Sequence, residues 1–290
     1  MSAEVRIASG DASAVIALHG AEARAWTVSG RELLWPGNAA IWDEISPILY
    51  PVVGWTRDGA RVDGRRYDLQ LHGFARHRDF TVAAQGADFV RLSLSDDAQT
   101  RALYPFAFTL AVEYRLTADA LHIALEVANP GQVPAPYACG LHPGFRWPFG
   151  GGPRQGAIVE FEREERADVP VIAPGGLIGA ARRPAPLQGA RLPLSDALFA
   201  DDAICFLDAA SRSLTFAESG GASITMDFPG FPHAALWTRP GAPFLCLEAW
   251  TGYSDPEGFD GDLFEKPGMR ILGPGAAARH EASYRFRAGN

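Results

Sequence analysis

Apolar and polar residues alternate with a period of two along much of this 290-residue chain. The clearest example is residues 108–116, where every second residue is a large apolar one. A turn at Thr117-Ala-Asp119 follows, and the alternation resumes over residues 121–127. Because successive side chains of a strand point to opposite faces, these two segments predict a long β-hairpin with one buried face.

Shorter segments of the same kind predict many more strands. We expect them at residues 13–18, 24–28, 47–53, 79–84, 88–94, 157–162, 204–207, 213–217, 222–228, 233–238, 244–249 and 283–287. Ser219-Gly-Gly221 is typical of a hairpin turn between two of them. No segment keeps a 3.6-residue period beyond about three turns, so few short helices are expected. The pattern predicts an all-β fold, a large antiparallel β-sandwich.

Residues 150–193 are rich in Gly and Pro and are predicted to be the least ordered part of the chain. Strand patterns lie on both sides of this region and within it, and no compositional boundary separates two cores. We therefore expect a single domain over residues 1–290, with long loops.

Composition narrows the classes of partner. The net charge of −8 argues against a surface for nucleic acid or anionic membrane. No apolar run approaches the ~20 residues that span a bilayer, and the N-terminus lacks the pattern of a signal peptide. Cys139, Cys205 and Cys246 are expected to be reduced, buried thiols of a cytoplasmic protein. Monomer and homodimer both stay open.

Three stretches carry candidate chemistry. The first is Leu71-His-Gly-Phe-Ala-Arg76, and the second is Tyr137-Ala-Cys-Gly-Leu-His-Pro-Gly-Phe-Arg-Trp-Pro-Phe149. In the second, Pro143 ends a strand and Gly144 permits a sharp turn, which places His142 on the lip of a cleft. Phe145, Trp147 and Phe149 are expected close by. The alternative is a buried structural histidine.

The third stretch is Leu245-Cys-Leu-Glu-Ala-Trp-Thr-Gly252. Period-two alternation puts Glu248 on the same strand face as Cys246 and Trp250. A carboxylate inside an apolar strand is costly to bury without a partner, and its pKa shifts. The alternative is a salt bridge at the rim of the sheet.

Taken together, the motifs resemble the aldose 1-epimerase (mutarotase) family, in particular its LacX-like branch. The resemblance covers nearly the whole chain. The matching motifs are Gly30-Arg-Glu-Leu-Leu-Trp35, Tyr50-Pro-Val-Val-Gly54, His72-Gly-Phe-Ala-Arg76, Tyr104-Pro-Phe106, His142-Pro-Gly-Phe145, Asp227-Phe-Pro-Gly-Phe-Pro232, Trp237-Thr-Arg-Pro-Gly241 and Glu248-Ala-Trp250. It implies a large β-sandwich with an open sugar cleft and no cofactor.

The resemblance also implies residue roles. His142 is then the general acid that protonates the ring oxygen, Glu248 the base at the anomeric hydroxyl, and His72 a residue that orients the sugar. Asp202 matches a sugar-binding aspartate, with Asp201 as the adjacent alternative and a turn-forming role equally open. The substrate-binding set predicted from the matching motifs is completed by Arg76 and Trp250.

One motif departs from the family. Many relatives carry an arginine after the glycine of the Val-Gly segment, whereas this chain has Trp55 there. Either Trp55 stacks on the sugar, or Arg57 reaches into the cleft beside it; alternatively, Arg57 pairs with Asp58 or Asp63 at the surface. The departure leaves the identity of the sugar open.

The function expected first is mutarotation of a free aldose. Two alternatives are a hexose-6-phosphate mutarotase, with Arg57, Arg76 or Arg78 on the phosphate, and a sugar-binding module without turnover. No metal site is expected, because no third ligand is evident beside His72 and His142.

Overall fold

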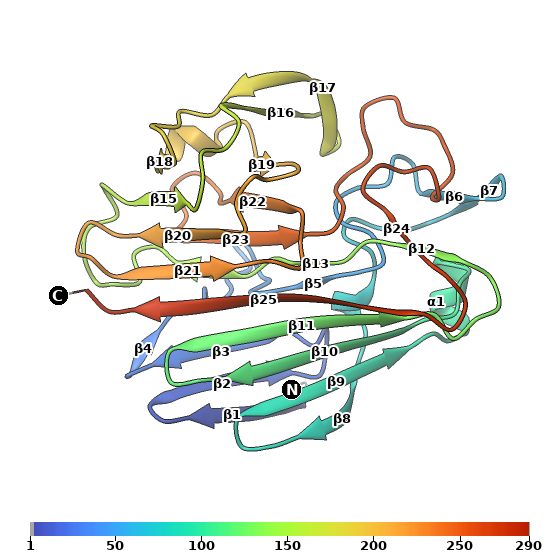
Figure 1. Ribbon diagram of the computed structural model, residues 1–290, viewed down its shortest axis with the longest axis horizontal. Coiled ribbons are helices and arrows are strands. Elements are labelled where there is room, and N and C mark those ends of the chain that lie inside the picture. Colours follow the sequence, from blue (N-terminus) through green and yellow to red (C-terminus); the bar gives the residue numbers. More distant parts are fainter. Residues whose placement is uncertain (1–2, 290) are drawn as a thin grey trace.

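Two large antiparallel sheets, packed face to face, form the body of the molecule in this computed structural model, which describes residues 3–289 (Figure 1). The larger sheet has nine strands, in the spatial order β18 (Arg191–Pro193), β15 (Ile158–Phe161), β20 (Ser213–Ala217), β21 (Ser223–Asp227), β25 (Ala277–Arg287), β11 (Ala120–Ala128), β10 (Thr109–Leu116), β9 (Phe89–Ser95) and β8 (Thr81–Gln85). The smaller has the order β19 (Ile204–Phe206), β22 (His233–Trp237), β23 (Phe244–Trp250), β13 (Gly140–Leu141) and β5 (Ile48–Leu49), and β14 (Gly144–Arg146) also pairs with β23. The predicted all-β sandwich is confirmed.

Smaller elements complete the fold. A four-stranded sheet contains β1 (Glu4–Ser9), β2 (Ala12–Ala17), β3 (Ala23–Val28) and β4 (Arg31–Glu32). Three two-stranded ribbons pair β6 (Ala60–Val62) with β7 (Arg65–Tyr67), β12 (Ala135–Tyr137) with β24 (Arg270–Leu272), and β16 (Asp168–Ala173) with β17 (Leu177–Pro184). The helical elements of residues 3–289 are the α-helix α1 (Ala98–Leu103) and the 3-10 turns η1 (Ala75–His77) and η2 (Asp196–Phe199). None of these is long and apolar enough to be a membrane span.

The hairpin predicted from the alternating segments is β10–β11. Leu110 lies opposite Val127 and Tyr114 opposite Ile123. All four side chains are buried, whereas Arg115, one residue along, is exposed. The period-two pattern therefore arises because one face of this sheet packs against the core. Ser219-Gly-Gly221 joins β20 to β21, also as predicted.

Strand β23 separates the core from the opposite face of the smaller sheet. Leu245 and Leu247 belong to the main hydrophobic cluster, and Tyr284 of β25 donates a hydrogen bond to the Leu247 carbonyl at 3.1 Å. Cys246 and Trp250 belong to two separate small clusters on the other side. The predicted alternation along this strand is confirmed, and it turns Glu248 away from the sandwich core.

Two predictions were incomplete. In the region 150–193, where long loops and one strand at 157–162 were expected, the structure has four strands, β15 to β18. Gly175 and Gly176 lie in the turn between β16 and β17, whereas Pro170, Gly179 and Pro184 lie within these two strands. The predicted strand at 47–53 is reduced to β5, because the carbonyls of Tyr50 and Pro51 bond to the amides of Phe74 and Ala138 outside a regular ladder. Cys139, Cys205 and Cys246 are free and buried, as expected.

Candidate active site

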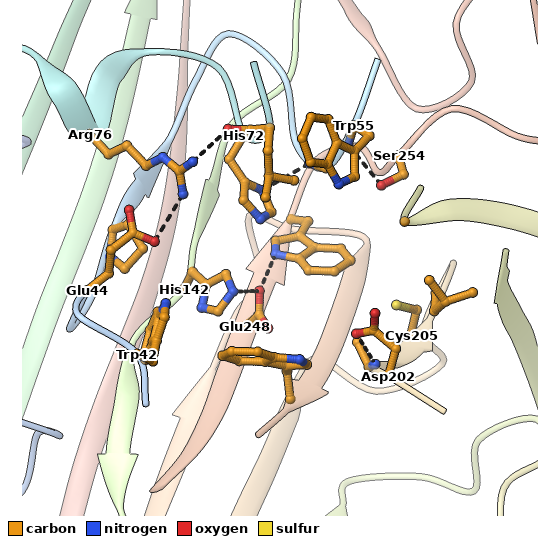
Figure 2. Close-up of a pocket in the computed structure, with 18 of the residues that line it drawn as sticks. Trp42, Glu44, Trp55, His72, Arg76, His142, Asp202, Cys205, Glu248 and Ser254 are labelled. Atoms are coloured by element: carbon orange, nitrogen blue, oxygen red, sulfur yellow. Dashed lines mark hydrogen bonds and ion pairs between the residues drawn. The ribbon is translucent and has the colours of Figure 1, made fainter. Parts of the chain in front are cut away.

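A cleft of about 670 Å³ lies on the face of the smaller sheet that points away from the core (Figure 2). Strands β22 and β23 contribute Trp237, Glu248 and Trp250 to its lining. The link between β13 and β14 contributes His142, and the segment before η1 contributes His72. The fold thus brings the three predicted catalytic residues into one cavity.

Glu248 is fully buried where β23 lines the cleft. The indole N–H of Trp250, two residues along the strand, donates to Oε2 at 3.1 Å, and Oε1 has no hydrogen-bond partner. Burial raises the pKa of the carboxyl well above its usual 4.5, and the Trp250 hydrogen bond opposes that rise. The position excludes a salt bridge at the sheet rim. A buried acceptor without a donor is costly, so Oε1 is suited to receive a ligand hydroxyl.

His142 occupies the two-residue link between β13 and β14, where Pro143 interrupts the ladder. Its Nε2 lies 3.2 Å from Oε2 of Glu248. Burial lowers the pKa of the imidazole to about 3. The ring is therefore neutral near neutral pH unless the carboxyl beside it gives up its proton.

The aromatic neighbours of His142 differ from those expected. Trp42 and Trp237 flank the imidazole, with ring centroids at 5.3 and 5.8 Å. The rings expected there, those of Phe145, Trp147 and Phe149, all face the main core instead. Gly144 makes no sharp turn; it pairs with Cys246 in β14, and a Cβ on it would lie 2.8 Å from the Trp42 ring. Its role is to let that ring approach.

His72 is held as a neutral hydrogen-bond donor. The backbone amide of Gly54 donates to its Nδ1 at 3.0 Å, so Nδ1 carries no proton and the neutral ring carries its proton on Nε2. Burial, followed by the nearby His142 and Arg76, lowers the pKa of His72 well below 6.5. The two imidazole centroids lie 5.5 Å apart, edge to face. His72 itself has a positive φ of 60°, an uncommon backbone conformation for a residue other than Gly.

Trp55 forms one wall of the cleft and remains 37% exposed. The hydroxyl of Ser254 accepts from its backbone amide at 3.0 Å. A Cβ on Gly176, at the tip of the β16–β17 hairpin, would lie 2.4 Å from the indole, so only glycine permits this contact. Gly54, with φ of 72°, also has no room for a side chain, because a Cβ on it would lie against Ser254. The indole is thus fixed between two loops.

Arg57 does not line the cleft, contrary to one of the two readings of this motif. Its backbone amide donates to Asp255 at 2.7 Å, and its guanidinium lies 3.8 Å from Asp58 at the surface. Asp255 in turn forms a buried ion pair at 2.6 Å with Lys266, the only lysine in the chain. The backbone of residue 57 is therefore anchored inward, which leaves its side chain outside the cavity.

Arg76 lines the cleft but is already engaged. It donates to Glu44 and to the Leu71 carbonyl, both at 3.0 Å. Burial raises the pKa of Glu44, and the Arg76 charge opposes that rise. The guanidinium is therefore held against one wall, with its charge offset by a neighbouring carboxyl.

Asp202 lines the cleft and Asp201 does not. Asp202 has a positive φ of 74°, and its carboxylate accepts from the Ala203 amide at 2.7 Å. Its negative charge contributes to the raised pKa of Glu248. Both the turn-forming and the cleft-facing roles considered for Asp202 are compatible with this geometry.

Several cleft residues were missed by the sequence analysis. They are Trp42, Glu44, Trp237, Arg239, Ile172, Gly176, Cys205 and Ser254. Trp237 was detectable: it stands opposite Cys246 in the β22–β23 ladder, two positions from Ala235, which stands opposite Glu248. It therefore shares the strand face of the predicted base. His19 and His77, two exposed histidines without matching motifs, also line the cavity.

One group of side chains has the composition of a metal site. Candidate ligand atoms of His142, Cys246 and Glu248 all lie within 4.8 Å of one another. This group does not include His72, the residue that the sequence analysis considered together with His142. Burial raises the pKa of the Cys246 thiol well above 9.0, which keeps it protonated, and the thiolate is the form that binds metals. His142 and Glu248 already contact each other, so we assign no metal here.

The fold and this cleft define a protein of the aldose 1-epimerase family. The family model described as aldose 1-epimerase matches residues 4–259, and the chain belongs to that family. Among curated relatives, the chromosomal protein LacX of Lactococcus lactis subsp. lactis is 31% identical over 237 residues, covering 78% of this chain and 79% of LacX.

Comparison with solved structures also supports this family. A galactose mutarotase-like protein from Lactobacillus casei superposes with a TM-score of 0.92 at 28% identity, covering 98% of this chain and 100% of the other. A galactose mutarotase related enzyme from Lactobacillus acidophilus gives 0.88 at 28% identity, covering 99% and 98%. The expected family and its LacX-like branch are therefore confirmed.

Proposed function

We propose that this protein is an aldose 1-epimerase that interconverts the α and β anomers of a free, uncharged aldose by acid–base ring opening. The observation that carries the proposal is the pairing of His142 and Glu248. Their nearest side-chain atoms are 3.2 Å apart, and Oε1 of Glu248 is left without a partner beside the cleft. One carbon of a cyclic aldose bears both oxygens that must exchange protons, so acid and base have to stand this close.

The reaction conserves the proton count of the pair. Glu248 takes the proton of the anomeric hydroxyl while His142 donates a proton to the ring oxygen, the C1–O5 bond breaks, and C1 becomes the aldehyde carbon. Rotation about C1–C2 presents the other face of the carbonyl. The hydroxyl on C5 then attacks C1 and returns its proton to His142, and Glu248 protonates the new anomeric oxygen. The pair ends as it began.

Without substrate, His142 and Glu248 are both uncharged. Burial disfavours both the imidazolium and the carboxylate, so the shared proton rests on Glu248. A sugar changes this balance, because its anomeric O–H donates to the carboxylate and its ring oxygen accepts from the imidazolium. Hydrogen bonds to the charged forms favour those forms. Binding of the substrate therefore moves the proton onto His142, across the 3.2 Å contact.

His72 serves as an orienting donor. With Nδ1 occupied by the Gly54 amide, its Nε2–H is free to hold a sugar oxygen. The aromatic side chains of Trp42, Trp55 and Trp237 supply apolar surface for the C–H face of the ring. Together they position a ligand that is polar at its edge and apolar on its face.

The charge of the cleft favours an uncharged sugar over a phosphorylated one. Apart from the protonated Glu248, its lining has four carboxyl groups (Glu22, Asp43, Glu44 and Asp202) and three guanidinium groups (Arg24, Arg76 and Arg239). Of the arginines considered for phosphate, Arg76 is paired with Glu44, Arg78 donates to Gln99, and Arg57 lies outside. A phosphate dianion would therefore meet net repulsion.

A binding module without turnover is the competing reading. It needs no acid–base pair, whereas this cleft has one of matched geometry. The deciding experiment is a polarimetric screen of free and 6-phosphorylated aldoses with native and heat-denatured protein. Faster anomer interconversion of at least one free aldose by the native protein supports the proposal. Sugar binding with rates equal to those of the denatured control would contradict it and favour the module.

A further inference from the structure

A second hollow, which we call the outer groove, continues from the cleft. It has a volume of about 630 Å³ and shares four lining residues with the cleft: Ile172, Asp202, Trp237 and Arg239. Ala200 and Asp201, in the turn after η2, line the outer groove and not the cleft. The shared wall makes the two spaces one elongated depression, with the His142–Glu248 pair in its inner part.

The inner cleft alone already exceeds the needs of one sugar ring. Pockets of ~300–1,000 Å³ hold drug-sized ligands, and a single pyranose is smaller than those. The outer groove extends this space on the side of Asp202 and Trp237. The anomeric carbon of the first ring has to sit at Glu248, so the carbons on the opposite side of that ring point away from the pair. A substituent there has room in the outer groove.

The walls of the outer groove have the chemistry of a carbohydrate site. Trp237 is half-buried beside His142 and lines both spaces, so its indole offers an apolar surface across the junction. Arg239 and Asp201 are exposed, and within residues 3–289 neither side chain makes a hydrogen bond or ion pair. A donor and an acceptor beside an aromatic face suit a ring that carries several hydroxyls.

The outer groove is also fixed in shape. Arg183 of β17 donates to the carbonyls of Leu198, Asp202 and Ala203 at 3.2–3.3 Å, which ties the β16–β17 hairpin to the turn after η2. On the other side of the hairpin, the amide of Ile178 donates to the Asp255 carbonyl at 2.9 Å. A preformed site loses less free energy to ordering when a ligand binds.

We propose that the outer groove is a second sugar subsite and that the natural substrate class is a reducing disaccharide or longer oligosaccharide. Its reducing ring occupies the inner cleft, and the next ring lies over Trp237 between Asp201 and Arg239. This inference rests on the proposed function. A charged substituent fits less well than a neutral ring, because Asp201 and Asp202 stand beside the Arg239 guanidinium.

The test compares anomer interconversion of glucose and galactose with that of maltose, cellobiose and lactose, followed by polarimetry or by exchange NMR. We expect at least one disaccharide to have a kcat/KM about tenfold or more above that of glucose. Ala200→Trp fills the outer groove from an exposed position with ordinary αR backbone. It should lower the disaccharide kcat/KM about tenfold and leave glucose within about twofold.

Asp201→Ala removes one polar contact and should raise the disaccharide KM severalfold without changing the glucose KM. Asp260→Ala, an exposed acid that lines neither space, is the matched control. Thermal midpoints of all variants check that they fold. Calorimetric binding of glucose and of the best disaccharide to Glu248→Gln gives a readout without turnover.

The outcomes separate the two proposals. No acceleration of any sugar, with disaccharides binding more tightly than glucose, would sink the epimerase and keep the subsite. Acceleration of glucose, with no disaccharide preferred and no selective loss in Ala200→Trp, would sink the subsite and keep the epimerase. Preference for a 6-phosphorylated hexose over every disaccharide would also overturn the subsite.

Discussion

Nε2 of His142 stands 3.2 Å from Oε2 of Glu248, while the other oxygen of that carboxyl has no protein partner. Glu248 lies on β23, and His142 lies in the two-residue link between β13 and β14, both of which pair with β23. The proposed ring opening requires acid and base to act at a single carbon of the substrate, and this contact holds the two side chains close enough for that.

Replacing the base separates chemistry from binding. Glu248→Gln keeps the shape and the acceptor for Trp250 but cannot take a proton, so we expect kcat to fall by ~10²–10⁴. Sugar affinity, measured by calorimetry, should change little. A kcat within a few-fold of the wild-type value would assign Glu248 a structural role.

Substitutions of the two histidines should reduce kcat to different extents. His142→Asn removes the acid that protonates the ring oxygen, whereas His72→Asn removes an orienting donor. We expect the larger loss of kcat for His142→Asn, and for His72→Asn an effect expressed more in KM. Initial rates over a range of sugar concentrations decide this, and the reverse order would mean that the roles are exchanged.

The pH profile of kcat/KM should not show the fall in activity that protonation of an ordinary histidine causes. The pKa of His142 is lowered to about 3 and that of Glu248 is raised, so the pair holds one proton throughout the interval between them. Adding a second proton, which disables the base, requires a pH near 3. We expect kcat/KM, corrected for the uncatalysed rate, not to fall as the pH decreases from 7 to about 5. A fall in activity centred on the usual histidine pKa of about 6.5 would contradict this.

Trp55, which stands where the resemblance implies an arginine, lines the cleft, and Arg57 does not. Arg57→Ala should leave KM and kcat unchanged, because its side chain lies at the surface beside Asp58. Trp55→Ala should raise KM about tenfold, which corresponds to ~1.4 kcal/mol of lost binding. Kinetics on the best substrate check both variants, and a raised KM in Arg57→Ala alone would restore the other reading.

The buried ion pair should matter for stability. Lys266 and Asp255 are both almost inaccessible, and Asp255 also accepts from the Arg57 amide. Lys266→Met leaves the Asp255 charge buried without its cation, which typically costs about 3–5 kcal/mol. Urea unfolding measures the loss. Arg57→Ala, which breaks only a surface contact, is the control and should stay within about 0.5 kcal/mol of wild type.

The sandwich was predictable because alternation of apolar and polar residues is a local property of a strand. The hairpin β10–β11 buries mainly one face, and the sequence records which face that is, whereas β23 is buried on both faces and its two sides differ only in what they contact. Most strands of residues 150–193 were not predicted, because Gly and Pro mark turns equally well in a loop and in a series of short strands. Irregular hydrogen bonding around Tyr50 has no period to detect.

The site was predictable as far as the motifs extended. His72, His142 and Glu248 lie in motifs and meet in the cleft. Trp42 and Glu44 lie in a segment without regular secondary structure, and only the fold brings them to the cavity. The position of Arg57 depends on Asp255, almost two hundred residues away along the chain, which no local pattern reveals.

Strand β23 has a neighbour on each side, so its backbone amides are shielded throughout the smaller sheet. Amides of such interior strands exchange with deuterium only in rare, large-scale openings, whereas loops exchange through local ones. We therefore expect Glu248, the proposed base, to lie in the slowest-exchanging part of the molecule, and Trp55 and the turn after η2 to lie in the faster part. Substitutions that alter sugar choice can accumulate in those loops without loosening the strand that carries Glu248.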